Sequence, residues 1–247
     1  MKLDHTLLEE LYSQGKSYKE ITEITGYNKN SVCGYFYKTK GKMKDPRKYR
    51  RNKIPLTEIQ KEILFGTLMG DGNIQKQKLN SYSGRFNHSI KQVEYLKHIK
   101  SELDNLTTDV RYFTSKTANK EYPSCYFSLK NNYELKPFYE LFYQEKKRDV
   151  PKDLSLLTPR AMAYWFMDDG SASSGCTISI ATNSFSLEGL LRLKKFLKKT
   201  YNIEVTITKE FRLYFPAESG RKFCELIKDY IIPEMMYKFK FIKHLLI

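Results

Sequence analysis

Two stretches of the chain share one design, and this repeat constrains the fold more than any other feature. "PLTEIQKEILFGTLMGDGNI" (55–74) and "LLTPRAMAYWFMDDGSA" (156–172) each pass from a threonine through an apolar helical run to Asp-Gly. Thr57 and Gln60 have the spacing of a capping box, and Thr158 followed by Pro159 is a favoured helix start. The chain is therefore predicted to contain two similar halves, each beginning with a helix.

Alternating and helical segments follow in the same order in both halves. Alternation predicts strands in 84–91, 109–116 and 124–130, and then in 176–183 and 204–216. Helices are predicted near 92–104, 132–144, 187–200 and 218–229. Each half is thus expected to be α-β-β-α-β-β-α, an α+β fold with pseudo-twofold symmetry. These helices are too few to cover both faces of each sheet. One face is therefore expected to pack on helices, and the other, which is polar, is expected to be open.

The first residues form a separate helical unit. Leucines at helical spacing, a stop at Gly15, a cap at Ser17 and a turn at Gly26 predict three short helices. The stretch "GKSYKEITEITGYNKNSVCGYF" resembles a helix-turn-helix, whose third helix enters the major groove. Its early exposed residues would be Asn28, Lys29, Asn30 and Ser31, with Tyr35 a further candidate. The alternative is a three-helix module that only packs.

Basic residues connect this unit to the rest. "KTKGKMKDPRKYRRNK" (38–53) has nine Lys or Arg and one acid, and the whole chain has 43 Lys and Arg against 28 acids, a net charge of +15. A polyanion, most often nucleic acid, is the expected partner, with Arg50 and Arg51 on phosphates; the alternative is a solvated tether. The predicted boundaries are 1–44 for the helical domain, 45–55 for the linker, and 56–150 and 151–247 for the two halves.

Other composition features exclude some classes. Four scattered cysteines, without a C-x-x-C pair, argue against zinc ribbons and suit a reducing compartment. The four scattered histidines argue against a histidine-based nuclease site or a His-rich metal cage. No membrane-spanning run or signal peptide is evident. We expect a soluble intracellular protein, in the cytoplasm, the nucleoid or an organelle matrix, with no membrane partner.

The two Asp-Gly endings place acids at an unfavourable position, because a helix C-terminus carries partial negative charge. Small residues at Gly66, Gly70, Ala161 and Ala163 would let the two helices pack closely and bring Asp71 beside Asp169. Such a pair is stable as carboxylates only with a cation between them, and Mg²⁺ suits oxygen ligands. Asp168 aligns with Gly70 and is expected to be a structural or supporting acid. A single Gly-Asp-Gly is more often an ordinary turn than a binding site, but two such endings after matching helices favour a metal-binding site.

These residues carry a resemblance to a known family. "LFGTLMGDG" (64–72), "MAYWFMDDG" (162–170) and "YIIPEMMYKF" (230–239) resemble the LAGLIDADG homing endonucleases, in the single-chain class with two motifs. The resemblance spans about 56–240 and is most specific in the second half. Met69 and Met167 replace the first acid of the motif, and Tyr164 replaces a packing glycine, which would loosen or shift the helix contact.

The resemblance implies a DNA-binding saddle and site-specific cleavage of double-stranded DNA across the minor groove, with short 3′ overhangs, by a monomer on a long target site. Asp71 and Asp169 would bind Mg²⁺ with the carbonyl groups of Gly70 and Asp168; Mn²⁺ would substitute, and Ca²⁺ would bind without supporting cleavage. Two basic residues would assist catalysis. Lys238 matches one of them, and Lys147 is preferred over Arg148 for the other.

Strand alternation independently nominates side chains that face DNA. In the first half they are Asn73, Gln75, Gln77, Arg85, Asn87 and Ser89. In the second half they are Thr177, Ser179, Asn183, Arg212 and Tyr214. The phase of 109–116 is ambiguous, which leaves Arg111 and Lys116 as weaker candidates. Many of these side chains could instead be ordinary exposed strand residues.

A non-cleaving regulator or an intron RNA maturase on the same scaffold is the alternative to an endonuclease. The presence of both Asp71 and Asp169 favours the endonuclease, because a binder does not need that costly pair.

Overall fold

The structure, a computed structural model, describes residues 3–40, 53–77, 81–117, 120–144, 147–173 and 176–239. The first range forms the expected small helical unit with its own core, made of α1 (His5–Ser13), α2 (Tyr18–Thr25) and α3 (Lys29–Lys40). Ser17 and Glu20 form a capping box at the start of α2, and Gly26 ends it with φ +67°. The turn of three residues between α2 and α3 has the length typical of a helix-turn-helix.

The first half follows the predicted order. It consists of α5 (Glu58–Met69), β1 (Asn73–Lys76), β2 (Tyr82–Ser89), α6 (Val93–Glu102), β3 (Arg111–Thr117), β4 (Lys120–Leu129) and α7 (Lys136–Phe142). The four strands form one antiparallel sheet in the order β1-β2-β4-β3. Short 3-10 helices η2 (Ile90–Gln92), η3 (Asp104–Leu106) and η4 (Tyr133–Leu135) lie between these elements.

The second half repeats this order with shorter strands. It consists of α8 (Pro159–Asp169), β7 (Gly170–Ala172), β8 (Ile178–Ile180), α9 (Leu187–Tyr201), β9 (Thr206–Ile207), β10 (Leu213–Phe215) and α10 (Ala217–Ile227), and then η5 (Lys228–Tyr230) and η6 (Pro233–Phe239). The sheet order is β7-β8-β10-β9, equivalent to that of the first half. The predicted pair of α-β-β-α-β-β-α halves in an α+β fold is therefore confirmed.

One connection differs from the sequence prediction. The helix expected near 132–144 is a 3-10 turn followed by α7, which ends at Phe142. The next residues form a two-stranded hairpin, β5 (Tyr143–Gln144) with β6 (Lys147–Arg148). Phe142 is buried with its ring edge-on to Phe65, and the Tyr143 hydroxyl accepts the Ile74 N–H at 3.1 Å. These contacts hold the chain at the end of α5, and the hairpin leads it toward the second half.

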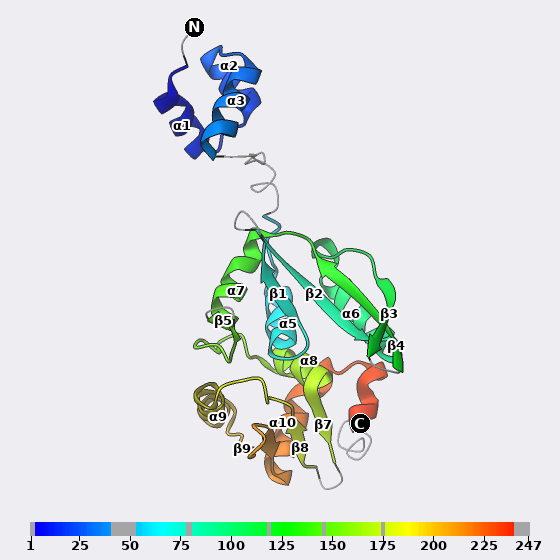
Figure 1. Ribbon diagram of the computed structural model, residues 1–247. Helices are drawn as coiled ribbons and strands as arrows, with labels where there is room; N and C mark the ends of the chain where they lie inside the picture. The colour runs from blue at the N-terminus through cyan, green and yellow to red at the C-terminus, as the bar shows by residue number, and fades with distance from the viewer. Residues whose placement is uncertain are drawn as a thin grey trace.

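The two halves meet through α5 and α8, which cross at the centre of the molecule (Figure 1). A Cβ built on Gly66 would lie 2.2 Å from the carbonyl oxygen of Ala161, so no larger residue fits there. Tyr164 does not separate the helices, because its hydroxyl lies 2.8 Å from His98 Nε2 on α6. The core is continuous across this crossing. The small residues therefore allow the close approach that the sequence predicts.

All four cysteines are free thiols. No helix within the described ranges combines the length and the apolar character needed to cross a membrane.

Candidate active site

The two Asp-Gly turns lie together where α5 and α8 end. Thr57 and Thr158 cap the starts of these helices. The chain leaves α8 directly into β7, and it leaves α5 through the Gly-Asp-Gly turn into β1. Where the helices end, a Cβ on Gly70 would lie 2.5 Å from Cβ of Asp168. Only one side chain fits at this level of the crossing, and the second half supplies it.

Asp168 links the two halves. Its side chain is 1% exposed and accepts hydrogen bonds from the Asp71 N–H at 3.1 Å and from the Tyr95 hydroxyl at 2.8 Å. Burial, reinforced by the negative charge of Asp71, raises the pKa of Asp168 well above its usual range. Both carboxyl oxygens are therefore engaged within the protein, and the side chain holds the first Asp-Gly turn in place.

The two turn aspartates differ in their exposure. The Asp71 side chain is 49% exposed, whereas that of Asp169 is mostly buried. Burial and the charge of Asp71 raise the pKa of Asp169 to about 6, against the opposing effect of Lys238, Arg148 and Arg212. The repulsion expected between these two acids is thus present, and basic side chains surround it.

Two basic side chains bind the carbonyl groups that precede the two turn aspartates. Lys238 Nζ donates to the Asp168 carbonyl oxygen at 2.6 Å, and Arg148 NH1 donates to the Gly70 and Gly72 carbonyl oxygens, both at 2.8 Å. Burial lowers the pKa of Lys238, although the charges of Asp168, Asp169 and Asp71 oppose this. Lys147 is exposed and precedes Arg148 on β6, where neighbouring side chains point to opposite faces. The structure therefore brings Arg148, rather than the preferred Lys147, to the turns.

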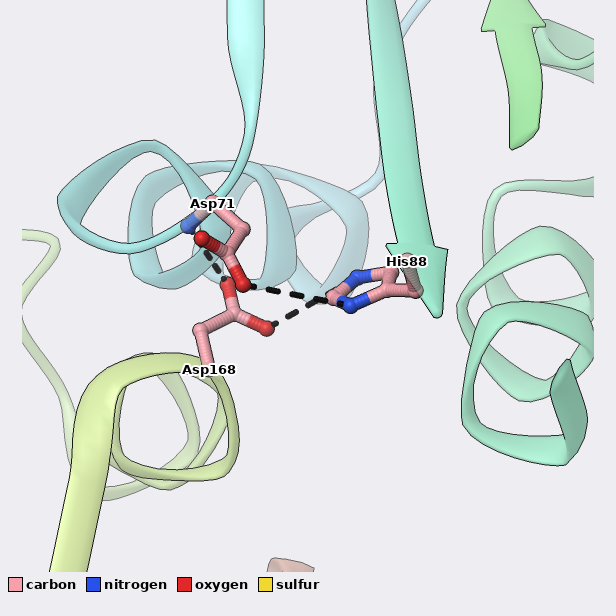
Figure 2. A group of neighbouring side chains, drawn as sticks. All are labelled: Asp71, His88 and Asp168. Atoms are coloured by element: carbon pink, nitrogen blue, oxygen red, sulfur yellow. Dashed lines mark hydrogen bonds and ion pairs between the residues drawn. The ribbon is translucent and has the colours of Figure 1, made fainter. Parts of the chain in front are cut away.

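His88 also belongs to this group, although the scatter of the four histidines along the sequence argues against a histidine-based site. Its Nδ1 lies 3.9 Å from Asp71 Oδ2, its Nε2 lies 4.0 Å from Asp168 Oδ1, and its side chain is 2% exposed (Figure 2). Burial lowers the pKa of His88, which favours the neutral imidazole. The alternation that turns Phe86 and Ile90 inward also turns His88 inward, and this signal could have identified it.

The donor atoms at the turns fit a divalent cation. Asp71, His88 and Asp168 each offer one ligand atom, and these atoms lie within 4.8 Å of one another. The Asp169 carboxylate interacts electrostatically with this group, because the charge of Asp71 raises its pKa. Carboxylate and carbonyl oxygens are ligands for Mg²⁺, Mn²⁺ and Ca²⁺. The group that the structure assembles can therefore hold a metal, and the accessible acid within it is Asp71.

The open face of the first sheet carries most of the polar side chains nominated there. In the antiparallel register Asn73 pairs with Arg85, and Asn87 pairs with Tyr126. Paired residues share a face, so one face presents Asn73, Gln75, Arg85, Asn87 and Ser89. The Arg85 guanidinium lies 4.4 Å from the centre of the Tyr126 ring. Gln77 lies just beyond β1, where its amide donates to Ser83 Oγ at 3.0 Å.

The register also resolves the ambiguous third strand. Arg111 pairs with Tyr126 and therefore shares the face of Asn87 and Arg85. Lys116 lies on the opposite face and forms an ion pair with Glu121 at 2.6 Å. Of these two candidates, the structure places only Arg111 on the open face.

The second sheet presents a smaller polar face. Ser179 pairs with Tyr214, and the Arg212 Nε donates to Ser179 Oγ at 3.0 Å. Thr177 lies just before β8 and, two residues before Ser179, is expected on the same side. Asn183 lies beyond β8, and its amide donates to the Glu210 carbonyl oxygen. The nominated residues of this half are thus near one another, but several already bind partners within the protein.

The remaining nominated residues lie outside the two halves. Lys29 and Asn30 are exposed at the start of α3, where the Asn30 N–H donates to the Asn28 side chain at 2.8 Å. Tyr35 instead faces α1, stacking on His5 at 4.4 Å between ring centres and donating to Glu9 at 3.0 Å. Arg50 and Arg51 lie outside the described residues.

Comparison with known proteins gives consistent matches to this architecture. Residues 61–223 match the model of the LAGLIDADG DNA endonuclease family. The chain is 35% identical over 211 residues to the DNA endonuclease I-ChuI of Chlamydomonas applanata, covering 75% of this chain and 96% of the relative. It is 29% identical over 196 residues to the cytochrome b mRNA maturase bI2 of Debaryomyces hansenii, covering 74% of each.

A solved structure, the homing endonuclease I-WcaI bound to its DNA recognition sequence, superimposes with a TM-score of 0.70 at 26% identity. This match covers 80% of the present chain and 92% of the other. Its extent agrees with the two halves, which account for most of the chain.

Proposed function

We propose that this chain, which belongs to the LAGLIDADG DNA endonuclease family, is a site-specific homing endonuclease that cleaves both strands of its DNA target. The observation that carries the proposal is the meeting of two Asp-Gly turns at the crossing of α5 and α8, beside two open polar sheet faces. Each half would supply one acid to the centre and one sheet to the major groove. Cleavage across the minor groove, with short 3′ overhangs, follows from the family resemblance.

The site would work with a divalent metal, for which we propose Mg²⁺. When bound, such an ion polarises the scissile phosphate and activates a water molecule for in-line attack. Asp71 and Asp169 would be the principal ligands. The carbonyl groups of Gly70 and Asp168, which also accept hydrogen bonds from Arg148 and Lys238, would assist through their remaining lone pair. Mn²⁺ is expected to replace Mg²⁺, and Ca²⁺ to bind without supporting cleavage.

The chain's own residues would divide the remaining work. The Asp168 side chain orients the first turn by accepting the Asp71 N–H. Lys238 and Arg148 reach the two turns from opposite halves and place positive charge where a phosphate would approach. His88, neutral and buried between Asp71 and Asp168, would support the orientation of Asp71. Lys147, exposed on the hairpin, would serve as a phosphate contact instead of a catalytic group.

The two sheets would read the target. Side chains on a strand face can bond base edges in the major groove, where each base pair presents a distinct pattern. Asn73, Gln75, Arg85 and Asn87 are proposed to do this in the first half, and Thr177, Ser179, Arg212 and Tyr214 in the second. Because one chain contains both halves, we propose that it acts as a monomer on a long target. We propose that the chain divides into a helical domain (1–44), a linker (45–55) and two halves (56–150 and 151–247).

A maturase is the second candidate, because one relative bears that name. The two functions differ in their need for the acids. A maturase that only binds intron RNA would keep its splicing activity after loss of both carboxylates, whereas an endonuclease would lose cleavage.

The deciding experiment changes the two acids one at a time. Duplexes cleaved by the wild-type chain with Mg²⁺ are first selected from a randomised library, and the variants are then assayed on the selected duplex. We expect Asp71→Asn or Asp169→Asn to reduce double-strand cleavage by roughly a thousandfold or more, since a metal ligand is lost, with DNA binding in Ca²⁺ largely intact. The exposed Asp229→Asn is the matched control. Unchanged cleavage by either active-site variant would refute the assignment.

A further inference from the structure

The helical unit at the start of the chain has one helix face that its own packing does not use. Val32 and Phe36 on α3 are fully buried against the other two helices. At 100° per residue, the opposite side carries Asn30, Gly34, Tyr37 and Lys38, which we call the α3 outer face. Tyr37 is 59% exposed, and Asn30 and Lys38 are exposed as well.

Gly34 is the unusual member of this face. A glycine inside a helix destabilises it relative to alanine. At Gly66 the close approach of another helix requires glycine, but a Cβ built on Gly34 would have no atom within 4 Å. Nothing in the described residues therefore needs the small size of Gly34. A close approach by something outside the chain would explain it.

Charge indicates what that partner is. Five acids and two lysines occupy residues 3–23, whereas residues 24–53 contain ten Lys or Arg and only one acid, Asp45. The change of sign occurs where α3 begins. The outer face thus belongs to the basic part of the unit and is continuous in sequence with the most basic stretch of the chain. A polyanion is complementary to it.

The packing of α3 fixes which side it presents. The Tyr35 ring stacks on His5, and its hydroxyl donates to Glu9 at 3.0 Å, so this side of α3 is held against α1. The Asn28 side chain accepts the Asn30 N–H at 2.8 Å and starts the helix. Gly26, with φ +67°, makes the tight turn that precedes it. These contacts leave the outer face available as a rigid surface.

We propose that the α3 outer face docks into the major groove of duplex DNA beside the cleavage site, with Gly34 at the point of closest approach to the DNA. The major groove admits one α-helix, and Asn30 and Tyr37 flank the glycine where polar side chains could reach base edges or phosphates. The proposal rests on the proposed function only in that the same target duplex carries both contacts. It lengthens the recognised sequence on one flank.

The test uses the full chain and substitutions at Gly34. A duplex library with randomised centre and flanks is selected by binding in Ca²⁺ and, separately, by cleavage in Mg²⁺. We expect wild type to select bases in the centre and on one flank, and Gly34→Leu to keep the central preference while losing the flank preference. Gly34→Leu should bind the wild-type-selected duplex about tenfold more weakly. Thr6→Leu, at an exposed position of α1, is the matched control and should behave as wild type.

Gly34→Ala gives a second, opposite readout. It should raise the thermal stability of the helical unit because alanine favours the helix, yet weaken flank selection. This variant decides the matter if circular dichroism shows that Gly34→Leu has unfolded α3. Equal flank selection by wild type, Gly34→Leu and Gly34→Ala would overturn the proposal. Loss of cleavage in all proteins, with flank selection by binding retained, would instead count against the proposed function alone.

Discussion

The two halves of the molecule have the same order of elements but differ at the point where they meet. Gly70 precedes the first turn aspartate, and Asp168 precedes the second. A Cβ on Gly70 would collide with Asp168, whose carboxylate instead crosses to the first half and accepts the Asp71 N–H. Two symmetric side chains cannot occupy this level of the crossing. Close packing of the two helices at the pseudo-twofold axis therefore requires different residues at these two equivalent positions.

The difference extends to the residues around each aspartate. The first turn is bound by Arg148 from a short hairpin, and the second by Lys238 from η6. Asp71 is half exposed and lies beside His88, whereas Asp169 is mostly buried among basic side chains. The halves therefore repeat a chemical arrangement with different residues. The following predictions test what each half contributes at the point where the two halves meet, in order of decreasing effect.

Gly66→Ala should have the largest effect, because it attacks the helix crossing itself. Its new methyl group would lie 2.2 Å from the Ala161 carbonyl oxygen, and a backbone atom cannot move aside as a side chain can. We expect a loss of about 3 kcal/mol in the free energy of unfolding, measured by urea denaturation. Ala161→Gly, on the opposite helix, creates no clash and should cost about 1 kcal/mol. Equal small losses would mean that the crossing is looser than described.

Arg148→Ala should lower the single-turnover cleavage rate by about a hundredfold, through loss of a positive charge fixed beside the first turn. Lys147→Ala is the control from the same hairpin and should stay within about threefold of wild type, as expected for one exposed phosphate contact. Lys238→Ala measures the equivalent contribution of the second half. A larger effect at Lys147 than at Arg148 would restore the choice preferred from sequence.

Asp168→Ala should destabilise the protein by about 2 kcal/mol, since it removes the acceptor of the Asp71 N–H and leaves the Tyr95 hydroxyl with only its longer bond to the Tyr164 carbonyl oxygen at 3.3 Å. Tyr95→Phe removes only one of these hydrogen bonds and should cost about 1 kcal/mol. Both values are measurable by chemical denaturation. If Tyr95→Phe cost as much as Asp168→Ala, the bond to Asp71 would contribute nothing, and the two halves would not be coupled through this carboxylate.

The acid limit of cleavage should reflect Asp169. Its pKa is raised to about 6, so the carboxylate needed for a metal becomes protonated as the pH falls through that value. At Mg²⁺ concentrations that do not saturate the site, the cleavage rate should drop about tenfold for each pH unit below 6, because the proton competes with the metal for this carboxylate. The folded state binds this proton more tightly than the unfolded state. The contribution of Asp169 to folding stability therefore increases as the pH falls below about 6 and is lost as the pH rises through that value.

Carboxyl NMR of the metal-free protein tests the same assignment directly. An Asp169 resonance that titrates near pH 6 is expected, and it should disappear in Asp169→Asn. Lys238→Met should raise this midpoint further, since the lysine charge lowers the pKa of Asp169. An Asp169 carboxyl that titrates near pH 4 would contradict the burial seen here.

Much of this organisation was predictable from particular residues. The capping threonines, the small residues at the crossing and the alternation in 84–91 indicated the helices, the close contact and the open face. The hairpin at 143–148 was not predictable, because each of its strands has only two residues and its position depends on Phe142 and Tyr143 packing against the first half. The choice between Lys147 and Arg148 depended on that hairpin.

The sequence alone determined the repeated order of elements, since local propensity and hydrophobic period act over a few residues at a time. It also determined that two acids follow matching helices. Only the tertiary structure decided that Asp168 bridges the halves, that His88 joins the acids and that Arg148 reaches the first turn. Those outcomes depend on contacts between residues 78 to 97 positions apart in the chain, which form only when the two helices pack and the sheets fold around them.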